Sequence, residues 1–451
     1  MQLNPEALAA RFPRRFRWSV ATAAFQIEGA RGEDGRGRSI WDEFVETPGR
    51  VKDGSTAEPG PESYHRAEED IALIRALGAD RYRFSVSWAR VQPDGRGAAN
   101  RQGLDYYDRL VDGLLRAEVT PFPTLYHWDH PVALEDAGGW LSRDMADRFA
   151  DYVDLVAARL ADRVRHWYTL NEPASMTLQG YGVGTLAPGQ ENLFGALPTV
   201  HHQLLAHGRA AQALRSRGPA EVGIPNNHTW VRPLRDTAED EIAAATYDLL
   251  HNRLFAEPLL TGEYPDLPAY GLPPMPVRAG DLELIARPMD FYGINFYNPT
   301  TVAAAVEPGP LPFRIVPTPG VPVTGFGEEW PIDPAALTAL LMDFQDRYRD
   351  QLPPIVISEN GASFPEPDSS ERVEDEDRIG YLAGHIAAVA EAMDAGVEVA
   401  EYTVWSLLDN FEWADGFTQR FGLVHVDHDT STRTPKASFD WYRALIRKGR
   451  S

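Results

Sequence analysis

Eight short runs of apolar, aromatic and β-branched residues recur along the 451-residue chain, with helical patterns between them. Runs of this length and composition are typical of β-strands. Strands that alternate with helices form a parallel sheet, and eight such units predict closure into a barrel. The sequence therefore predicts an α/β fold, a single (β/α)8 TIM barrel with elaborated βα loops over residues 1–451. The predicted strands are residues 16–26, 81–88, 120–127, 166–173, 221–228, 290–297, 354–361 and 401–410.

The segments between these runs have helical periodicity. Residues 68–78 carry apolar side chains at helical spacing, and Gly78 is placed to end that helix. Residues 104–118 and 143–162 alternate an apolar stripe with a charged face, which is typical of a helix packed on a sheet.

Composition narrows the possible partners. A net charge of -23 argues against binding to nucleic acid or to an anionic membrane surface. The chain has no cysteine, which excludes disulfides, thiolate metal ligands and a cysteine nucleophile. No window approaches about 18 consecutive apolar residues, and residues 1–18 lack the apolar core of a signal peptide. These features predict a cytoplasmic protein that does not bind membranes.

Polar and aromatic side chains stand at the carboxyl end of nearly every predicted strand. In a barrel those ends meet on one face, where catalytic residues lie. Capping of strands by polar residues at loop starts would explain a few cases, but it explains eight poorly. The residues are Gln26, Trp88, His127, Asn171–Glu172, Asn227–His228, Asn295–Tyr297, Glu359–Asn360 and Asp409–Asn410.

Two of these strand ends carry a glutamate, Glu172 at the end of the fourth predicted strand and Glu359 at the end of the seventh. Facing carboxyl groups are the minimal apparatus for glycoside hydrolysis. Two charges about 5 Å apart at an effective dielectric constant of about 20 repel by roughly 3 kcal/mol, or about two pK units. Such a pair holds one proton between its members near neutral pH.

Metal binding is the alternative use of two acidic groups. The histidines of residues 201–207, HHQLLAH, lack the i, i+4 spacing of a helical zinc motif. We interpret them as helix surface and packing. The sequence therefore predicts neither a metal nor a cofactor.

Several longer motifs carry a family likeness over nearly the whole chain. They are WSVATAAFQIEGA (18–30), GRGRSIWDEF (35–44), YRFSVSWARVQPDGRG (82–97), LYHWDHPVALEDAGGW (125–140), TLNEP (169–173), YGINFY (292–297), ISENG (357–361), VWSLLDNFEWADGF (404–417) and RTPKASFDWY (433–442). In this order they are highly specific. The sequence resembles glycoside hydrolase family 1, the β-glucosidase family.

The resemblance implies roles for the residues that match its motifs. Glu172 would be the general acid/base, and Glu359 the nucleophile that forms a covalent glycosyl-enzyme. Arg83 and Tyr297 match positions that contact and orient the nucleophile. Asn171 would hold the sugar 2-hydroxyl group. The residues expected to bind the substrate are Gln26, His127, Trp128, Asn171, Asn295, Trp330, Trp405, Glu412 and Trp413.

The resemblance also implies the kind of sugar. Members that cleave 6-phosphoglycosides carry a serine followed by basic residues where this chain has Glu412 in FEWADGF. A carboxylate there suits a neutral sugar and repels a phosphate, so an unphosphorylated glycoside is expected.

The chain departs from the family pattern at a few positions. HWDLPQAL appears as HWDHPVAL, which places His130 and Val132 at unusual positions. The tryptophan often found after NEP is Ala174, Glu401 replaces a glycine, and Pro331 stands after Trp330 where glutamate is usual. We expect several of these changes near the aglycone entrance. They suggest a bulky or aromatic leaving group rather than a second glucose.

The resulting prediction is a retaining β-glycosidase, foremost a β-glucosidase, that acts on a small-molecule β-glycoside. A transglycosidase would use the same residues. A non-catalytic sugar-binding barrel would have a damaged carboxylate pair, whereas this chain has both glutamates. The sequence does not separate glucose from galactose or fucose, and it leaves the oligomeric state open.

Overall fold

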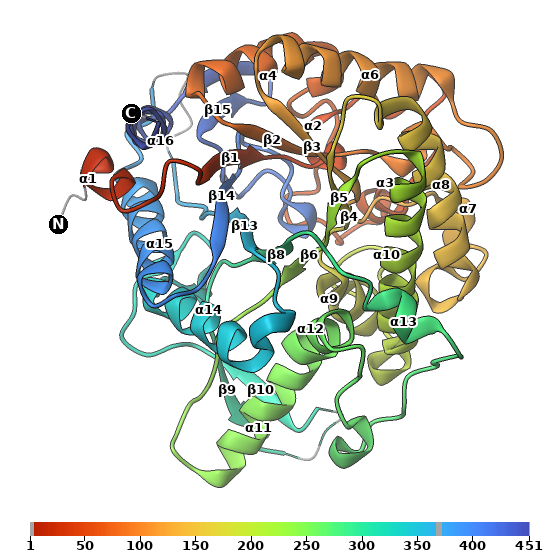
Figure 1. Ribbon diagram of the computed structural model, residues 1–451, viewed down its shortest axis with the longest axis vertical. Coiled ribbons are helices and arrows are strands. Elements are labelled where there is room, and N and C mark those ends of the chain that lie inside the picture. The colour runs from red at the N-terminus through yellow and green to blue at the C-terminus, as the bar shows by residue number, and fades with distance from the viewer. Residues whose placement is uncertain (1–3, 308, 310, 367–371, 451) are drawn as a thin grey trace.

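A ring of parallel strands surrounded by helices forms the centre of the computed structural model, which describes residues 4–307, 309, 311–366 and 372–450 (Figure 1). The strand order is β5-β4-β3-β2-β1-β14-β13-β8-β6. Only Ile224 separates β5 (Glu221–Gly223) from β6 (Pro225–Asn227), so the two ends of this order belong to one interrupted strand. The ring closes through that segment, and the predicted (β/α)8 barrel is confirmed.

Each predicted run contains a barrel strand, but several strands end earlier than expected. The first run ends as a strand at Ala21 and continues as helix α2 (Ala24–Ile27), so Gln26 lies on a helical turn. The fourth ends at Leu170, one residue before Asn171. The other barrel strands are β1 (Arg17–Ala21), β2 (Arg81–Ser85), β3 (Thr120–Tyr126), β4 (His166–Leu170), β8 (Tyr292–Asn295), β13 (Ile355–Asn360) and β14 (Val399–Trp405).

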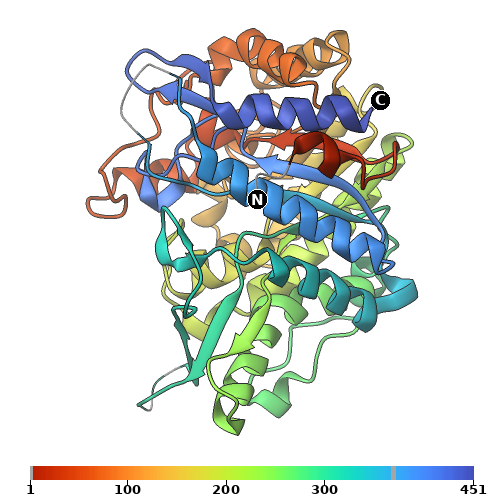
Figure 2. The ribbon, with the colours of Figure 1, turned by 90° about the vertical axis from the view of Figure 1, so that its left-hand side faces the viewer.

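The three helices predicted from periodicity are present. The first of them, α4, ends at Gly78, whose φ of 80° lies in the left-handed region that favours glycine. Figure 2 shows α14, α15 and α16 side by side on one flank of the barrel. The long helices are α4 (Ser63–Leu77), α6 (Arg101–Arg116), α8 (Asp144–Leu160), α10 (Pro198–Arg217), α14 (Pro334–Tyr348), α15 (Glu376–Asp394) and α16 (Ala437–Gly449).

Shorter elements fill the βα loops. Strands β7 (Val231–Pro233), β9 (Thr300–Ala304) and β10 (Phe313–Val316) form a small sheet beside α11 (Ala238–Asp248), below the barrel in Figure 1. Two hairpins lie elsewhere, β11 (Val323–Thr324) with β12 (Gly327–Pro331), and β15 (Val424–Asp427) with β16 (Thr432–Pro435). Other short helices include α3 (Ile40–Glu46), α5 (Trp88–Val91), α7 (Val132–Glu135), α9 (Pro173–Ser175), α12 (Leu254–Leu260), α13 (Asp281–Ile285) and the π-helices η2 (Met176–Gly182) and η4 (Leu249–Arg253).

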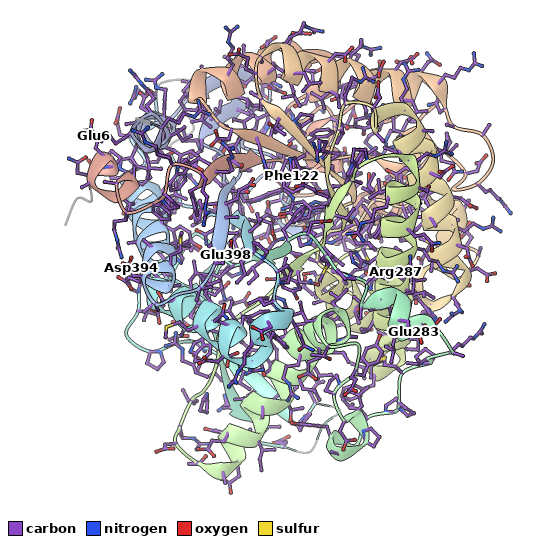
Figure 3. The ribbon with its side chains drawn as sticks, in the orientation of Figure 1. Glu6, Phe122, Glu283, Arg287, Asp394 and Glu398 are labelled. Carbon is purple, nitrogen blue, oxygen red and sulfur yellow. The ribbon has the colours of Figure 1, made fainter. Side chains whose placement is uncertain are left out.

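A layer of large side chains fills the interior of the barrel near the amino ends of its strands. Phe122 and Tyr168 stack with ring centroids 4.3 Å apart, and Phe291 and Val356 complete the cluster. In Figure 3, Phe122 lies within the ring of strands, whereas the labelled Glu6 and Asp394 lie at the rim of the molecule. Packed layers of this kind close a barrel and leave its carboxyl end for chemistry.

The described part of the chain contains no helix long and apolar enough to cross a membrane. The histidines of residues 201–207 lie on α10 and are buried, with His201 bonded to Asp281, His202 to the Trp140 carbonyl and His207 to Thr169. Their predicted packing role is confirmed. Their predicted place on the helix surface is wrong, because all three side chains are buried on α10, which packs against α8 and β4.

Candidate active site

A cavity of about 990 Å³ opens at the carboxyl ends of the barrel strands. A volume of this size suits a small-molecule ligand. Three further predicted residues, Arg83, Gln26 and Asn295, are buried directly behind the cavity wall. The predicted site residues that line the cavity are His127, Trp128, Asn171, Glu172, Tyr297, Trp330, Glu359, Trp405, Glu412 and Trp413.

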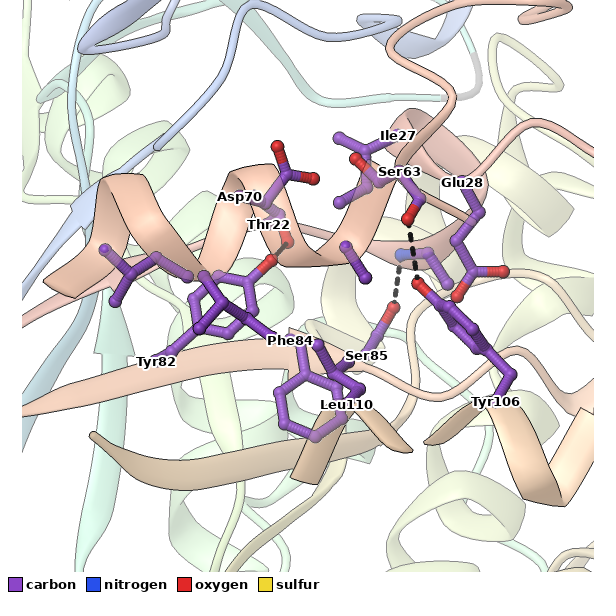
Figure 4. Close-up of a pocket in the computed structure, with 14 residues that line it drawn as sticks. Thr22, Ile27, Glu28, Ser63, Asp70, Tyr82, Phe84, Ser85, Tyr106 and Leu110 are labelled. Carbon is purple, nitrogen blue, oxygen red and sulfur yellow. Dashed lines mark hydrogen bonds between the residues drawn. The ribbon is translucent and has the colours of Figure 1, made fainter. Parts of the chain in front are cut away.

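A second, much smaller cavity lies between β2 and residues 22–28 and is closed by α4 and α6 (Figure 4). It has a volume of about 20 Å³, and Ser63, Asp70 and Tyr106 are among its lining residues. That is room for about one water molecule, so this cavity does not compete as a substrate site.

Glu359 lies near the end of β13, where the strand register shifts beside both neighbouring strands. Such irregularities re-aim side chains near functional sites. The Arg83 guanidinium lies 2.6 Å from one carboxylate oxygen, and the Tyr297 hydroxyl donates to the other at 2.5 Å. Burial raises the pKa of Glu359, and Arg83 and Tyr297 oppose that rise. Glu359 is therefore held between a cation and a phenol.

Glu172 follows β4 with a φ of 47°, and Pro173 starts the next helical turn. A glutamate in this left-handed conformation is strained, and such strain concentrates at functional sites. Its carboxyl oxygens accept from the Asn295 amide at 2.6 Å and the Ser175 hydroxyl at 2.7 Å. Burial, and after it the charge of Glu359, raises the pKa of Glu172 to about 7.

The two carboxyl groups therefore differ in their partners. Glu359 has a direct ion pair with Arg83, whereas only neutral donors bond directly to Glu172. An adjacent cation favours the charged form of a carboxyl group, and burial favours the neutral form. Of the two, Glu359 ionises first and the shared proton stays on Glu172.

Asn171, the residue before Glu172, connects three other residues of the site by hydrogen bonds. Its carbonyl oxygen accepts from Arg83 at 2.6 Å and from Asn295 at 3.1 Å, and its amide nitrogen lies 3.1 Å from the His127 ring. Burial, followed by the charge of Arg83, lowers the pKa of His127 well below its usual value. A neutral imidazole and an amide are thus fixed side by side, and both can bond a hydroxyl group.

Gln26 contacts the loop that follows β14. Its side-chain amide nitrogen donates to the Phe411 carbonyl at 2.8 Å and approaches the Glu412 carboxyl group at 3.3 Å. Its carbonyl oxygen is buried and has no hydrogen-bond partner within the described chain. Trp405 and Trp413 each stack on the His127 ring, with centroids 5.8 and 5.7 Å away. This combination of free polar atoms and flat apolar faces suits a sugar ring.

An aromatic wall lines the cavity beside Glu359. Trp330 of β12 lies 5.1 Å from the Tyr297 ring and stacks on Phe326 at 4.4 Å. Pro331 also lines the cavity, as expected for a departure near the entrance. The sequence did not predict Phe326, which belongs to a two-strand hairpin that has no alternating pattern.

Other departures from the family pattern lie elsewhere. Ala174, Glu401 and His130 are buried and do not line this cavity. Glu401 stands near the amino end of β14, where it accepts from Arg81 at 2.7 Å and Ser19 at 2.5 Å. These three residues therefore give no support to the expectation that several departures lie near the aglycone entrance.

Two supporting residues were not predicted from the sequence. Ser175 bonds Glu172, and Ser358 donates at 2.6 Å to Asn295. Ser175 lies three residues after Glu172, a spacing that brings side chains together on a helical turn and could have identified it.

One group of potential metal ligands lies outside this cavity. Glu366, Asp409 and His425 bring their ligand atoms within 4.8 Å of one another. The Lys436 ammonium lies 2.6 Å from Glu366 and 2.9 Å from Asp409, so a cation already neutralises them. These residues form an ion-pair cluster and do not fit a metal.

Comparison with known proteins agrees with this geometry. The model of glycosyl hydrolase family 1 matches residues 8–450. A 1,4-beta-D-glucan glucohydrolase of Thermotoga neapolitana is 41% identical over 97% of this chain and 98% of its own. The structure of a family 1 b-glucosidase from Thermotoga maritima has a TM-score of 0.91 and 39% identity, covering 97% of this chain and 98% of that one.

A third similar protein is the virulence factor SghA of Agrobacterium tumefaciens, solved with its substrate analog salicin. That structure has a TM-score of 0.94 and 40% identity, and covers 99% of this chain and 98% of its own. The family match spans almost every residue, including both carboxylates and their partners. The chain therefore belongs to glycosyl hydrolase family 1 and is a retaining β-glycosidase.

Proposed function

We propose that this glycosidase is foremost a β-glucosidase, with Glu359 as nucleophile and Glu172 as general acid/base. The observation that carries the assignment is the difference between the two carboxyl groups. Glu359 is paired with Arg83 and Tyr297, while the pKa of Glu172 rises to about 7 because it is buried beside Glu359. A nucleophile must be ionised and a general acid must be protonated, which matches these surroundings.

In the first step, a Glu359 oxygen attacks the anomeric carbon from the α face and forms an ester bond. The bond to the leaving oxygen breaks, and that oxygen takes the proton of Glu172. In the second step, Glu172 removes a proton from water, whose oxygen attacks the anomeric carbon and releases Glu359. Two inversions give net retention, and Glu172 ends protonated again.

The remaining site residues are assigned to the sugar and its leaving group. We assign Gln26, His127 and Glu412 to the glucose hydroxyls, and Asn171 to the 2-hydroxyl group. Asn295 positions Glu172, to which it donates at 2.6 Å. The sugar-binding side is completed by Trp128, Trp405 and Trp413, and the aglycone wall by Trp330.

An aromatic aglycone fits the wall that Trp330 and Phe326 form. Stacking between aromatic rings adds to the gain from burial, and these two rings already lie parallel in the cavity. Support comes from the similar protein SghA, whose substrate analog is salicin.

We infer that residues 1–451 form one catalytic domain, because the family match covers residues 8–450 and one hydrophobic core runs from Leu8 to Ile446. The net charge of -23 supports a small-molecule substrate without nucleic acid. The lack of cysteine is consistent with a cytoplasmic location, which stays a prediction.

A panel of 4-nitrophenyl β-D-glycosides tests the proposal. We expect turnover of the glucoside with retained configuration, and weaker turnover of the galactoside and fucoside. Release of nitrophenol ranks the sugars, and proton NMR of the first-formed sugar reports the anomer. A galactoside cleaved faster than the glucoside would overturn the choice of glucose, and an inverted product would overturn the roles of both carboxyl groups.

The pH dependence follows from Glu172. Burial and the charge of Glu359 raise the pKa of Glu172 to about 7, so kcat/KM should fall above that pH as the general acid loses its proton. It should also fall at low pH, where Glu359 becomes protonated and can no longer attack. The limiting slope is about tenfold per pH unit. Initial rates at low substrate concentration from pH 5 to 9 measure this limb. A rate that rises through pH 7 would contradict Glu172 as the acid.

Glu412 should decide between neutral and phosphorylated sugars. Burial, and after it the charge of Asp415, raises the pKa of Glu412 well above its usual value. Glu412→Ser removes a carboxyl group that can bond sugar hydroxyls, and we expect about a tenfold to hundredfold loss of kcat/KM on the glucoside. Asp415→Ser, three residues later and also in the cavity lining, is the matched control. It should lower kcat/KM much less. Unchanged kinetics in Glu412→Ser would remove this assignment.

A further inference from the structure

His130 departs from the family pattern and remains without a role in the reaction as described. It is fully buried, three residues after His127, and its ring does not line the cavity. Its two ring nitrogens bond Tyr126 at 2.9 Å and Glu135 at 3.0 Å. A leucine, the residue in the family motif, could make neither bond.

The direction of these bonds is fixed by their neighbours. The indole N–H of Trp140 donates to the Tyr126 hydroxyl at 3.1 Å, so that hydroxyl is free to donate its own proton to His130. The other ring nitrogen then carries a proton and donates to Glu135. In this series of hydrogen bonds from Trp140 through Tyr126 and His130 to Glu135, each donor has an acceptor.

Glu135, at the end of α7, collects two more donors. The Tyr181 hydroxyl from η2 shares one carboxylate oxygen with His130, and the Gln190 amide bonds the other oxygen. Burial alone would raise the pKa of Glu135, but these hydrogen bonds and the nearby His130 lower it overall. Glu135 is therefore an ionised group that depends on three donors from two segments, His130 after β3 and two residues of the stretch 176–190.

The space around Glu135 confirms how closely the segments approach. Gly139 has a φ of 49°, and a side chain there would lie 2.1 Å from a Glu135 oxygen and 2.4 Å from the Tyr181 hydroxyl. Trp140 also donates its backbone N–H to Tyr181 at 3.1 Å. Only glycine leaves room for this contact.

Two of the donors belong to the stretch of residues 176–190, which forms one side of the active-site cavity. Gln179, Thr185 and Leu186 of this stretch line the cavity. The stretch follows Glu172 directly, and a general acid must lie beside the leaving oxygen. Residues 176–190 therefore border the part of the cavity that holds the aglycone.

We propose that His130 is a positioning residue for the aglycone: through Glu135 it fixes residues 176–190, and so it selects for the leaving group without touching the sugar. The inference rests on the proposed function as a β-glucosidase. Removing His130 would leave a buried carboxylate short of one donor, a loss that costs more than the bond itself contributes. The least costly response is a shift of Glu135 and the segment bonded to it.

The test compares leaving groups in His130→Leu, the substitution that restores the family residue. For the bulky 4-methylumbelliferyl β-glucoside, we expect KM to rise and kcat/KM to fall about tenfold. For β-glucosyl fluoride, whose leaving group is a single atom, kcat/KM should stay within about twofold. The affinity for deoxynojirimycin, measured by calorimetry, should also be unchanged because that compound occupies only the sugar side.

Matched variants separate positioning from general damage. His166→Leu removes another histidine that lies beside a glutamate, with one ring nitrogen 3.0 Å from Glu221, at the far end of the barrel. This variant should leave unchanged the ratio of kcat/KM for the methylumbelliferyl glucoside to kcat/KM for glucosyl fluoride. His130→Gln, which can accept from Tyr126 and donate to Glu135, should recover most of the loss. Adding His130→Leu to Glu135→Gln should cost less than it does in the natural chain, because the unpaired charge is gone.

Three outcomes would overturn the proposal. They are an equal loss on the fluoride and the bulky glucoside, no loss on the bulky glucoside, and weakened deoxynojirimycin binding in His130→Leu. If His130→Leu does not fold, the ratio in Glu135→Gln decides in the same way. Failure of the proposed function looks different, because the natural chain would then cleave none of the β-glucosides.

Discussion

Glu359→Gly should lose hydrolysis of 4-nitrophenyl β-glucoside by roughly 10⁵- to 10⁶-fold, the scale seen when a covalent nucleophile is removed. Without the carboxylate no glycosyl-enzyme forms. Arg83, 2.6 Å from Glu359 in the natural chain, would also be left as an unpaired buried cation. Breaking a buried pair costs about 3 to 5 kcal/mol of stability, so folding is checked by circular dichroism before rates are compared.

Azide should restore turnover of the glycine variant. The substitution leaves a space on the α face of the sugar, beside the Arg83 cation, and a small anion fits there. Glu172 still protonates the leaving oxygen, so azide attacks the anomeric carbon once and the product is the α-glucosyl azide. Proton NMR of the product identifies the anomer from its coupling constant.

Glu359→Gln is the matched control. It removes the nucleophile but keeps the volume and the acceptor for Tyr297, so it should be inactive and azide should not rescue it. A β-azide from the glycine variant would contradict the nucleophile assignment, because it would require two inversions. Equal rescue of both variants would show that azide acts elsewhere.

The barrel could be predicted from the sequence because its strands are short and their ends are polar. The ends of individual elements could not be predicted where contacts between distant parts of the chain determine them. Gln26 belongs to a run that resembles one strand, yet the chain turns into α2 after Ala21. The Ala24 backbone N–H donates to the Ser85 hydroxyl, and the Phe411 backbone N–H donates to the backbone carbonyl of Gln26. No local pattern encodes those partners.

The candidate site shows the same division. The carboxylate pair stands out in the sequence because charged groups rarely end buried strands. The residues that set their pKa values are scattered: Ser175 is local to Glu172, but Asn295 comes from another strand. His130 could be recognised in the sequence as an unusual residue. Its hydrogen bond to Glu135 could not be predicted, because it depends on how α7 packs against η2 in the folded protein.

Glu172→Ala should show losses that depend on the leaving group. For 2,4-dinitrophenyl β-glucoside, whose phenolate leaves without a proton, formation of the glycosyl-enzyme should change little. For cellobiose or an alkyl glucoside, kcat/KM should fall by about 10²- to 10⁴-fold, the usual contribution of a general acid. The fall in kcat/KM above about pH 7 should also disappear, because the group that titrates there is gone. A series of aryl glucosides measures the dependence, and equal losses across it would instead assign Glu172 to binding.

The second step of the same variant gives a check that is independent of leaving groups. With the activated glucoside, the glycosyl-enzyme on Glu359 should accumulate, because no base remains to take a proton from water. Azide needs no base, so it should raise kcat and give the β-glucosyl azide, the anomer opposite to that from Glu359→Gly. Ser175→Ala, which removes only the 2.7 Å hydrogen bond to Glu172, is the control and should not respond to azide. Opposite anomers from the two variants can arise only if each carboxylate works on its own face of the sugar, so the same anomer from both would refute the assigned pair as a whole.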